Sequence, residues 1–325
     1  MEFPSTLAEA APAAHKAHRR WYSHGFNTPL AWGLIHRVTP RLPRWILVPL
    51  HHATSLLFFL ILRRERSAAR ANLRRIAGKT GFANLRLTYR LFYNFSRFMV
   101  AYTEIPTLER LDFRKRIDGA EETERLTLQK IAEGKGVIIA TAHLGHWDLG
   151  LKFLPMLGVP VHVVILDENA SEVARYVEKV RDNPNLRIHR MGTTPMLALE
   201  LMLALKRGEI VAIQVDRAAG QSVMSVPFFG DPAPLPTGPV ELAIASGAPV
   251  LPVFIVFDRG DRYRILTMES MVFEKDAARP QEQLGQAMCR MAGMLESAIR
   301  RYPDQWFSFY DVWLPAPGVT ERPHA

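Results

Sequence analysis

The segment VIIATAHLGHWDLG (residues 137–150) joins an uninterrupted apolar run to a polar stretch with two histidines, a tryptophan and an aspartate. A short apolar run without polar alternation is typical of a strand that is buried on both faces of a parallel sheet. Ligands of such sheets bind beyond the carboxyl ends of the strands. The polar stretch therefore begins where the sequence predicts a functional site.

Apolar runs and helical patterns alternate from about residue 134 onward. The predicted strands cover residues 136–141, 161–166, 186–190, 210–215, 250–257 and 263–268. Helices are predicted around residues 171–181, 194–207, 238–247 and 281–302. This alternation predicts an α/β fold with a central mixed, mostly parallel sheet flanked by helices. Residues 1–120 are predicted as a helical region that packs on an α/β core of residues 121–325. No low-complexity linker separates the two regions, so one integrated domain is expected.

The charge of the chain is concentrated near its N-terminus. Residues 1–120 carry 20 lysine and arginine residues against 7 aspartate and glutamate residues, whereas the whole chain has a net charge of +9. A basic region of this kind indicates an anionic partner, either a nucleic acid or a phospholipid surface. No groove-reading or single-strand-binding motif accompanies the charge, so we expect a membrane partner and no nucleic acid.

An apolar stretch at residues 45–62 runs directly into an arginine cluster. The stretch has 18 residues but is interrupted by a proline and several polar side chains, so it is borderline for a membrane-spanning helix. Two stripes follow at helical spacing, one apolar (Leu62, Ala69, Leu73 and Ile76) and one basic (Arg63, Arg66, Arg70 and Arg74). The pattern predicts a helix at an anionic membrane surface, and a core helix with a solvated basic face is the alternative.

The cysteine content narrows the chemistry further. Cys289 is the single cysteine, which excludes an intramolecular disulfide framework and a cysteine-rich metal site. It lies in a helical pattern, where a packed core thiol is expected.

The N-terminus shows no secretory signal pattern, so a reducing location that faces the cytoplasm is predicted.

Three interpretations compete for the polar stretch after the first strand. His143, His146 and Asp148 could supply three metal ligands, although their spacing matches no zinc motif. Alternatively, His143 acts as a general base and Asp148 orients its imidazole, with Gly145 permitting the tight backbone turn. The third interpretation is a polar turn without function. No G-x-S-x-G segment is present, so a covalent acyl-enzyme is not supported and direct attack by a substrate hydroxyl is expected.

The segment HLGHWD (residues 143–148) resembles the H-x4-D motif of glycerolipid acyltransferases, and most of all that of the lipid A biosynthesis (late) acyltransferase family. Further similar segments follow in the same order. They are a block at residues 210–254 with V-x-F-F-G, T-G-P and G-A-P-V-L-P, and a closing P-x-Q-W segment within residues 302–313. The resemblance covers most of the chain from about residue 30.

This resemblance implies an acyltransferase with His143 and Asp148 as catalytic residues. The enzyme would move a fatty acyl chain from an acyl-carrier protein or coenzyme A thioester to a hydroxyl of a lipid or glycolipid, without a cofactor or a metal. It would work on the cytoplasmic face of a bacterial inner membrane. Two departures, Asp216-Arg217-Ala218 and Phe309-Tyr310-Asp311, leave the acceptor open. A metal-dependent hydrolase and a non-catalytic membrane-binding protein remain alternatives.

Candidate substrate-binding residues follow later strands and turns. Arg190 and Arg217 are phosphate-binding candidates, and the aromatic turn after residue 227 is expected to line an acyl tunnel with an acidic rim. Gly238 and Pro239 begin a predicted helix whose amino end offers backbone N–H groups to an anion. The full set of candidates is Arg190, Asp216, Arg217, Phe228, Phe229, Gly230, Asp231, Gly238 and Pro239.

Overall fold

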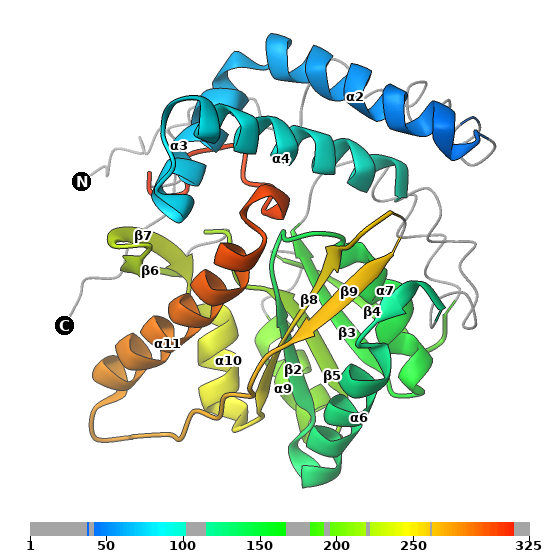
Figure 1. The fold of residues 1–325 in the computed structure, drawn as a ribbon. Helices are drawn as coiled ribbons and strands as arrows, with labels where there is room; N and C mark the ends of the chain where they lie inside the picture. Colours follow the sequence, from blue (N-terminus) through cyan, green and yellow to red (C-terminus); the bar gives the residue numbers. More distant parts are fainter. Residues whose placement is uncertain are drawn as a thin grey trace, which may run out of the picture.

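The computed structural model describes residue 38 and residues 42–101, 115–166, 183–191, 196–218, 222–260 and 262–314. Within these ranges, seven strands form one sheet in the order β1-β9-β8-β2-β5-β3-β4 (Figure 1). The strands are β1 (Ile117–Asp118), β2 (Val137–Thr141), β3 (Val161–Leu166), β4 (Leu186–Met191), β5 (Ile210–Gln214), β8 (Val250–Phe257) and β9 (Tyr263–Thr267). Neighbours from β8 to β4 pair in parallel, and β9 pairs antiparallel with β8. The predicted mixed, mostly parallel sheet is confirmed.

Strand β2 lies in the middle of the sheet and is buried on both faces. Ile138 and Ala140 belong to one hydrophobic cluster, whereas Val137 and Ile139 belong to the other. Alternate residues of a strand point to opposite faces, so every position of a doubly covered strand must be apolar. The uninterrupted apolar run is the direct sequence signature of this central position.

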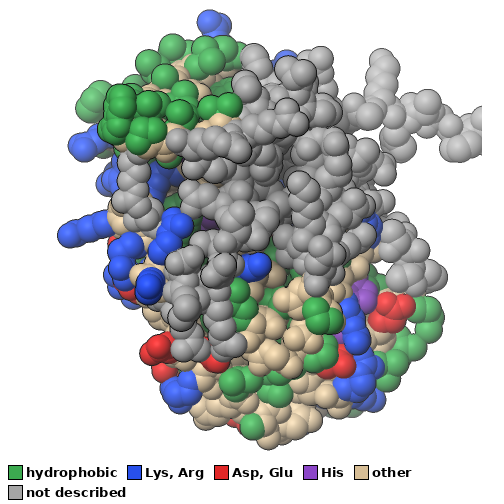
Figure 2. All heavy atoms as spheres, turned by 90° about the vertical axis from the view of Figure 1, so that its right-hand side faces the viewer, with side chains coloured by type: hydrophobic (Ala, Val, Ile, Leu, Met, Phe, Trp, Pro, Cys, Tyr) green, Lys and Arg blue, Asp and Glu red, His purple; other side chains and the backbone are tan. Residues whose placement is uncertain are grey.

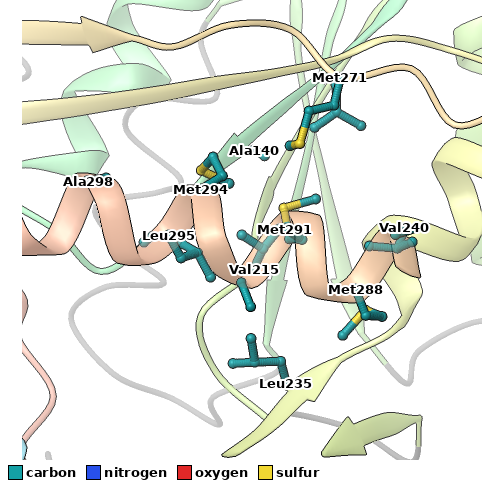
Figure 3. Packing of buried hydrophobic residues seen from close by; sticks show 14 of the residues in the cluster. Ala140, Val215, Leu235, Val240, Met271, Met288, Met291, Met294, Leu295 and Ala298 are labelled. Carbon is teal, nitrogen blue, oxygen red and sulfur yellow. The ribbon is translucent and has the colours of Figure 1, made fainter. Parts of the chain in front are cut away.

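Helices cover both faces of the sheet. The cluster that contains Ile138 also takes in side chains of α9 (Leu197–Lys206), α10 (Gly238–Ser246) and α11 (Pro280–Arg301). Met288, Met291 and Met294 of α11 lie in this cluster together with Ala140 and Val215 (Figure 3). The opposite cluster takes in α6 (Ala120–Lys130), α7 (Gly150–Phe153) and much of the N-terminal helical layer. The predicted helix around residues 171–181 lies outside the described residues.

The N-terminal region forms a helical layer over one end of the sheet (Figure 1). It consists of α2 (Arg44–Ile61), α3 (Arg63–Ala77) and α4 (Gly81–Ala101). Helix α2 packs on α4 through Phe59, whose ring meets Tyr89 edge-on at 5.7 Å and Phe92 edge-on at 5.4 Å. This packing agrees with a helical region that rests on the core, while the division at residue 120 stays a prediction.

The membrane interpretation of the arginine helix needs a correction. Ala69, Leu73 and Ile76 of α3 are buried in the protein core, so the apolar stripe of this helix faces the protein and cannot face a bilayer. An apolar stripe at helical spacing occurs both in a helix packed on a protein core and in a helix packed on lipid. The sequence therefore left both interpretations open.

The exposed apolar surface lies on α2 instead. Its large exposed side chains are Trp45, Val48, Leu50, Leu56, Leu57, Leu60 and Ile61, with Trp45 the most exposed at 76%. Hydrophobic side chains gather at the top of the molecule, at the level of this helix (Figure 2). Among the described residues, no single helix is long and apolar enough to cross a bilayer. The segments Trp45–Ile61 and Arg63–Ala77 pass that test only as a pair, bent by 97° at their junction.

Two further features differ from the expectations. A two-stranded antiparallel hairpin of β6 (Val223–Phe228) and β7 (Asp231–Pro236) was not predicted, because its prolines are typical of loops. Prolines are tolerated here since each strand of an isolated pair has one side free of ladder hydrogen bonds.

The predicted core position of Cys289 is wrong. Its thiol lies on the exposed side of α11, one position from the buried Met288.

Candidate active site

The parallel pairing of β2 and β5 brings two polar residues together beyond the carboxyl ends of the strands. Thr141 pairs with Gln214 at the end of the ladder, and Val215 donates a backbone hydrogen bond to the Thr141 carbonyl at 3.0 Å. His143 and Asp216 each lie two residues past that last pair. Register alone therefore places their side chains at the same point of the sheet edge.

His143 and Asp216 form a hydrogen-bonded pair. The Nδ1 atom of His143 lies 2.9 Å from Oδ1 of Asp216, and the backbone N–H of His143 donates to Oδ2 at 3.0 Å. The Asp216 side chain is fully buried, whereas the imidazole is 12% exposed. Because Nδ1 is engaged with the carboxylate, Nε2 is the nitrogen that remains for a substrate proton.

The protonation states of the pair suit proton transfer. Burial and the positive charge of Arg217 lower the pKa of His143 to about 4, although Asp216 acts in the opposite direction. Burial alone would raise the pKa of Asp216, but His143, Arg217 and the Trp306 N–H together lower it to about 2. At neutral pH the imidazole is uncharged and the carboxylate is ionised, which is the state of a general base with an orienting acid.

The loop that holds His143 depends on a glycine. Gly145 has a φ of +66°, and a Cβ atom there would lie 2.2 Å from the carbonyl oxygen of Ile255. The next residue, His146, donates its backbone N–H to the same carbonyl at 2.6 Å. The close approach pins the loop against β8, as expected for Gly145 from the sequence.

The structure does not bring Asp148 onto His143. Asp148 lies in the short 3-10 helix η4 (Trp147–Leu149), and the carboxylate bonded to the imidazole is that of Asp216. Within the described residues the Asp148 side chain makes no hydrogen bond, and burial raises its pKa to about 7. The expected His143–Asp148 hydrogen bond is therefore wrong, while a catalytic role for Asp148 stays a prediction.

His146 is enclosed by aromatic rings. Phe98, Phe257 and Tyr263 have ring centroids 5.0, 5.8 and 5.7 Å from its imidazole. Burial lowers the pKa of His146 to about 3, so it is neutral. Across the described ranges no three His, Cys, Asp or Glu side chains gather closely enough to hold a metal ion. The alternative three-ligand set of His143, His146 and Asp148 is not assembled there, and His146 forms part of a wall.

Arg217 and Tyr310 lie beside the pair. The Arg217 guanidinium donates from Nη2 to the Phe307 carbonyl at 3.1 Å and lies 6.0 Å from the centroid of the Tyr310 ring. Burial raises the pKa of Tyr310 to about 12, so its hydroxyl stays protonated. Arg190 lies near the carboxyl end of the edge strand β4, beyond β3 from Asp216. Of the two phosphate-binding candidates, Arg217 is the one beside the His143–Asp216 pair.

The aromatic turn between β6 and β7 belongs to the core. Phe228 is completely buried between Trp306 and Trp313, whose ring centroids lie at 6.0 and 5.7 Å. The Phe229 N–H donates to Glu296 at 2.5 Å, and its positive φ of 52° is unusual for a residue with a side chain. These contacts are those of packed core residues, and an acyl-binding role for Phe228, Phe229 and Gly230 stays a prediction.

The remaining candidates lie at the two ends of β7. Asp231 pairs with Arg75 at 3.1 Å and is more than half exposed, so its carboxylate is engaged on the protein surface. Gly238 begins α10 and Pro239 lies in its first turn, as predicted. The preceding Thr237 is fully buried, and its hydroxyl has no hydrogen-bond partner among the described residues. Anion binding at this helix end stays a prediction.

The sequence interpretation assigned no role to Trp306 and placed Asp216 among the substrate-binding residues. The structure places both at the centre of the site, because the Trp306 Nε1–H donates to Asp216 Oδ2 at 2.9 Å. His143 lies two residues and Asp216 one residue past the ends of the predicted strands 136–141 and 210–215, and these short offsets were the signal that could have revealed the pair. Nothing in the sequence indicated which side chain Trp306 would contact.

A family profile matches the part of the chain that contains this site. The profile of the bacterial lipid A biosynthesis acyltransferase family matches residues 29–314, which include every residue of the pair and its surroundings. The chain belongs to this family. The resemblance inferred from HLGHWD and the later blocks is thereby confirmed.

Two curated proteins similar to the chain are named phosphatidylinositol mannoside acyltransferases. The chain is 24% identical over 187 residues to a phosphatidylinositol mannoside acyltransferase of Mycobacterium tuberculosis (strain ATCC 25618 / H37Rv). The aligned region covers 57% of this chain and 56% of that protein. It is also 24% identical over 183 residues to the enzyme of that name from Mycolicibacterium smegmatis, and this aligned region covers 56% of this chain and 58% of that protein. The matched region therefore spans little more than half the length of these curated relatives.

Proposed function

We propose that this member of the family is an O-acyltransferase that moves a fatty acyl chain from a thioester to a hydroxyl of a lipid or glycolipid. The observation that carries the proposal is the His143–Asp216 pair at the carboxyl edge of β2 and β5, with Nδ1 and Oδ1 2.9 Å apart. A neutral imidazole whose second nitrogen remains free of the carboxylate is the requirement for general-base activation of a hydroxyl.

The reaction follows from this arrangement. Nε2 of His143 accepts the proton of the acceptor hydroxyl while the hydroxyl oxygen attacks the thioester carbonyl carbon. The tetrahedral intermediate then expels the thiolate, which accepts the proton from the imidazolium and leaves as a thiol. The products are an ester and a free thiol. Asp216 holds the imidazole by Nδ1 and stabilises the imidazolium through its negative charge.

No protein nucleophile is required by this sequence of steps. The one cysteine of the chain, Cys289, lies on the exposed side of α11. The Asp216 carboxylate is fully buried and bonded to Nδ1, the imidazole nitrogen opposite the proposed base Nε2. Direct transfer from donor to acceptor is therefore the mechanism that these residues support. Arg217, which lies beside the pair, is the proposed contact for a phosphate of the donor or of the acceptor.

The donor class proposed is a thioester of acyl-carrier protein or of coenzyme A, and the acceptor class is a hydroxyl-bearing lipid A-type or related glycolipid. Support for the acceptor class comes from the family profile and from relatives named for phosphatidylinositol mannoside. No cofactor is proposed.

A membrane location is proposed together with this activity. Leu56, Leu57 and Leu60 of α2 are each about half exposed, which is unfavourable in water and favourable in a bilayer interface. The exposed Arg70 and Arg74 of the adjoining helix add attraction to anionic head groups. We propose that these helices attach the enzyme to the cytoplasmic face of a bacterial inner membrane.

The test is a panel of donors and acceptors with purified full-length protein, read by mass spectrometry of the lipid products. Acyl-carrier protein and coenzyme A thioesters are each offered with a lipid A-type precursor, a phosphatidylinositol mannoside and a lysophospholipid. We expect one acceptor to gain one acyl chain, and His143→Ala to abolish the gain.

Two other outcomes would overturn the proposal. Hydrolysis of a substrate that stops with EDTA and returns with zinc would indicate a metal-dependent hydrolase. Binding to anionic vesicles without any product, and without an effect of His143→Ala, would indicate a non-catalytic membrane-binding protein.

A further inference from the structure

A C-terminal segment crosses the loop that carries His143. The segment follows α11 and the 3-10 helix η6 (Pro303–Gln305). Gly145 donates its backbone N–H to the Gln305 carbonyl at 2.8 Å, and Phe307 donates to the His143 carbonyl at 2.9 Å. Between these two bonds, Trp306 bridges to Leu144. The backbone of Trp306 is thus fixed to the same loop as the proposed base.

The indole of Trp306 completes the hydrogen bonding of Asp216. Oδ1 of this carboxylate faces Nδ1 of His143, while Oδ2 accepts both the His143 backbone N–H at 3.0 Å and the Trp306 Nε1–H at 2.9 Å. Asp216 is fully buried and Trp306 is 1% exposed. Because water does not reach Oδ2, the indole donor is not replaceable by solvent.

The segment that carries Trp306 is fixed by hydrogen bonds to other parts of the protein. Side-chain N–H groups of Asn72, on α3, donate to the carbonyls of Ser308 at 3.1 Å and Tyr310 at 2.8 Å. Gln305 bonds both backbone groups of Phe257 at the end of β8, at 2.8 and 3.0 Å. These bonds anchor the segment on either side of Trp306, so the direction of its N–H is set before any substrate binds.

We propose that Trp306 is a positioning residue of the acyl transfer reaction, and that its indole N–H fixes the orientation of the Asp216 carboxylate that orients His143. The inference rests on the proposed function for its effect on rate, but its structural half concerns the free protein. A tryptophan that only filled the core would need its ring and not its N–H.

The matched comparison is Trp313, eight percent exposed and in the same segment. Its Nε1–H donates to the backbone carbonyl of Phe228 at 3.0 Å, so it also makes one buried indole hydrogen bond. That bond does not involve Asp216 or His143. Replacing either tryptophan by phenylalanine removes a similar volume and one indole N–H donor. Only the N–H of Trp306 donates to the Asp216 carboxylate.

The Trp306→Phe substitution should change rate and titration together. Without the indole donor, Oδ2 keeps one hydrogen bond and the carboxylate can rotate away from Nδ1. We expect kcat to fall by about tenfold or more, the rate equivalent of one hydrogen bond to a charged group, with little change in KM. The less stabilised carboxylate is a stronger base, so the pKa of His143 should rise and the acidic limb of the pH–rate profile should move to higher pH.

The experiment compares Trp306→Phe and Trp313→Phe with the wild type, each alone and with Asp216→Asn. We expect only Trp306→Phe to shift the acidic limb and to lower kcat by the stated factor, and we expect that effect to disappear in the Asp216→Asn background. A wild-type profile and kcat in Trp306→Phe, or the same fall with and without Asp216, would overturn the proposal.

Two additions keep the test decisive. Proton NMR of histidine-labelled protein without substrate follows the imidazole Nδ1–H, whose downfield resonance should move or broaden in Trp306→Phe and persist in Trp313→Phe. This arm requires no activity, so it separates failure of the Trp306 inference from failure of the proposed function. If the phenylalanine variant does not fold, benzothienylalanine at position 306 keeps the ring shape and replaces the N–H by sulfur, and an unchanged resonance there would overturn the proposal.

Discussion

Asp216 holds His143 at both ends of that residue, with Oδ1 at 2.9 Å from the imidazole Nδ1 and Oδ2 at 3.0 Å from the backbone N–H. A carboxylate that grips the backbone as well as the ring of a base fixes both the position of the residue and the tautomer of its imidazole. The two residues are 73 positions apart in sequence and meet because their strands are neighbours in the sheet. This relationship determines what the site residues should do when they are changed.

His143→Ala should lower acyl transfer by on the order of 100-fold or more without unfolding, because it removes the proposed base. Asp216→Asn should also lower kcat strongly, since a neutral amide cannot stabilise the imidazolium or fix its tautomer. Steady-state rates on the true substrate pair, with circular dichroism as the folding control, check both. Near-full activity in His143→Ala would show that the mechanism is wrong.

Asp148→Asn tests the second predicted catalytic residue. The sequence predicts a strong loss of activity, while the structure shows no bond between this carboxylate and His143. We therefore expect the acidic limb of the pH–rate profile to stay in place in Asp148→Asn, whatever its effect on rate, and to move in Asp216→Asn. A limb that moves with Asp148 instead would return the orienting role to that residue.

Stability should depend on pH through Asp148. Burial raises the pKa of Asp148 to about 7 in the folded state, above its ordinary value near 3.8. The folded protein therefore holds a proton that the unfolded chain has lost, and the contribution of this residue to stability falls as the pH rises from about 4 to about 7. Asp148→Asn should be similar to the wild type at pH 4 and more stable at pH 8, measured as Tm. Equal Tm differences at both pH values would contradict the raised pKa.

Gly145→Ala should be strongly destabilising. Its Cβ would meet the Ile255 carbonyl at 2.2 Å in a left-handed backbone conformation, and the expected cost is at least about 2 kcal/mol. Gly150 is the matched control, because it has helical φ and ψ and a Cβ there would meet nothing within 4 Å. Gly150→Ala should be neutral or slightly stabilising in urea denaturation. Similar midpoints for the two variants would contradict the close approach of the loop to β8.

Attachment to membranes should depend on α2. The double substitution Leu56→Gln and Leu60→Gln removes two half-exposed leucines and should weaken binding to phospholipid vesicles by roughly tenfold or more. Leu199→Gln with Leu203→Gln is the control, since these leucines are exposed at 38% and 43% on α9 and have the same spacing. Vesicle flotation measures both, and equal binding of the two variants would remove α2 from the proposed attachment.

The charged part of that attachment has its own test. Arg70→Gln with Arg74→Gln should weaken binding to anionic vesicles by about 1 kcal/mol for each arginine and leave binding to zwitterionic vesicles unchanged. Lys206 on α9 and Lys275 in the loop before α11 are both exposed, and their change to glutamine controls for total charge. High salt should release only part of the wild-type protein, because burial of apolar side chains does not depend on ionic strength.

Local patterns in the sequence predicted most of the strands and helices of the α/β core. Strands at residues 161–166 and 250–257 and helices at the positions of α9, α10 and α11 are where the apolar patterns predicted them, because burial on one or both faces imposes those periods on the chain. The sequence also located the functional loop after β2 and the need for Gly145. Local patterns carry this information, since each depends on residues only a few positions apart.

Which side chains meet in the site depends on the packing of the whole chain. The partner of His143 is Asp216 rather than the nearby Asp148, and the donor behind it is Trp306, 90 positions further along the chain. The burial of the stripe on α3 and the exposure of the apolar face of α2 were decided in the same way. These outcomes depend on strand order, register and helix packing, which arise from the burial of the whole chain and leave no signature in any single segment.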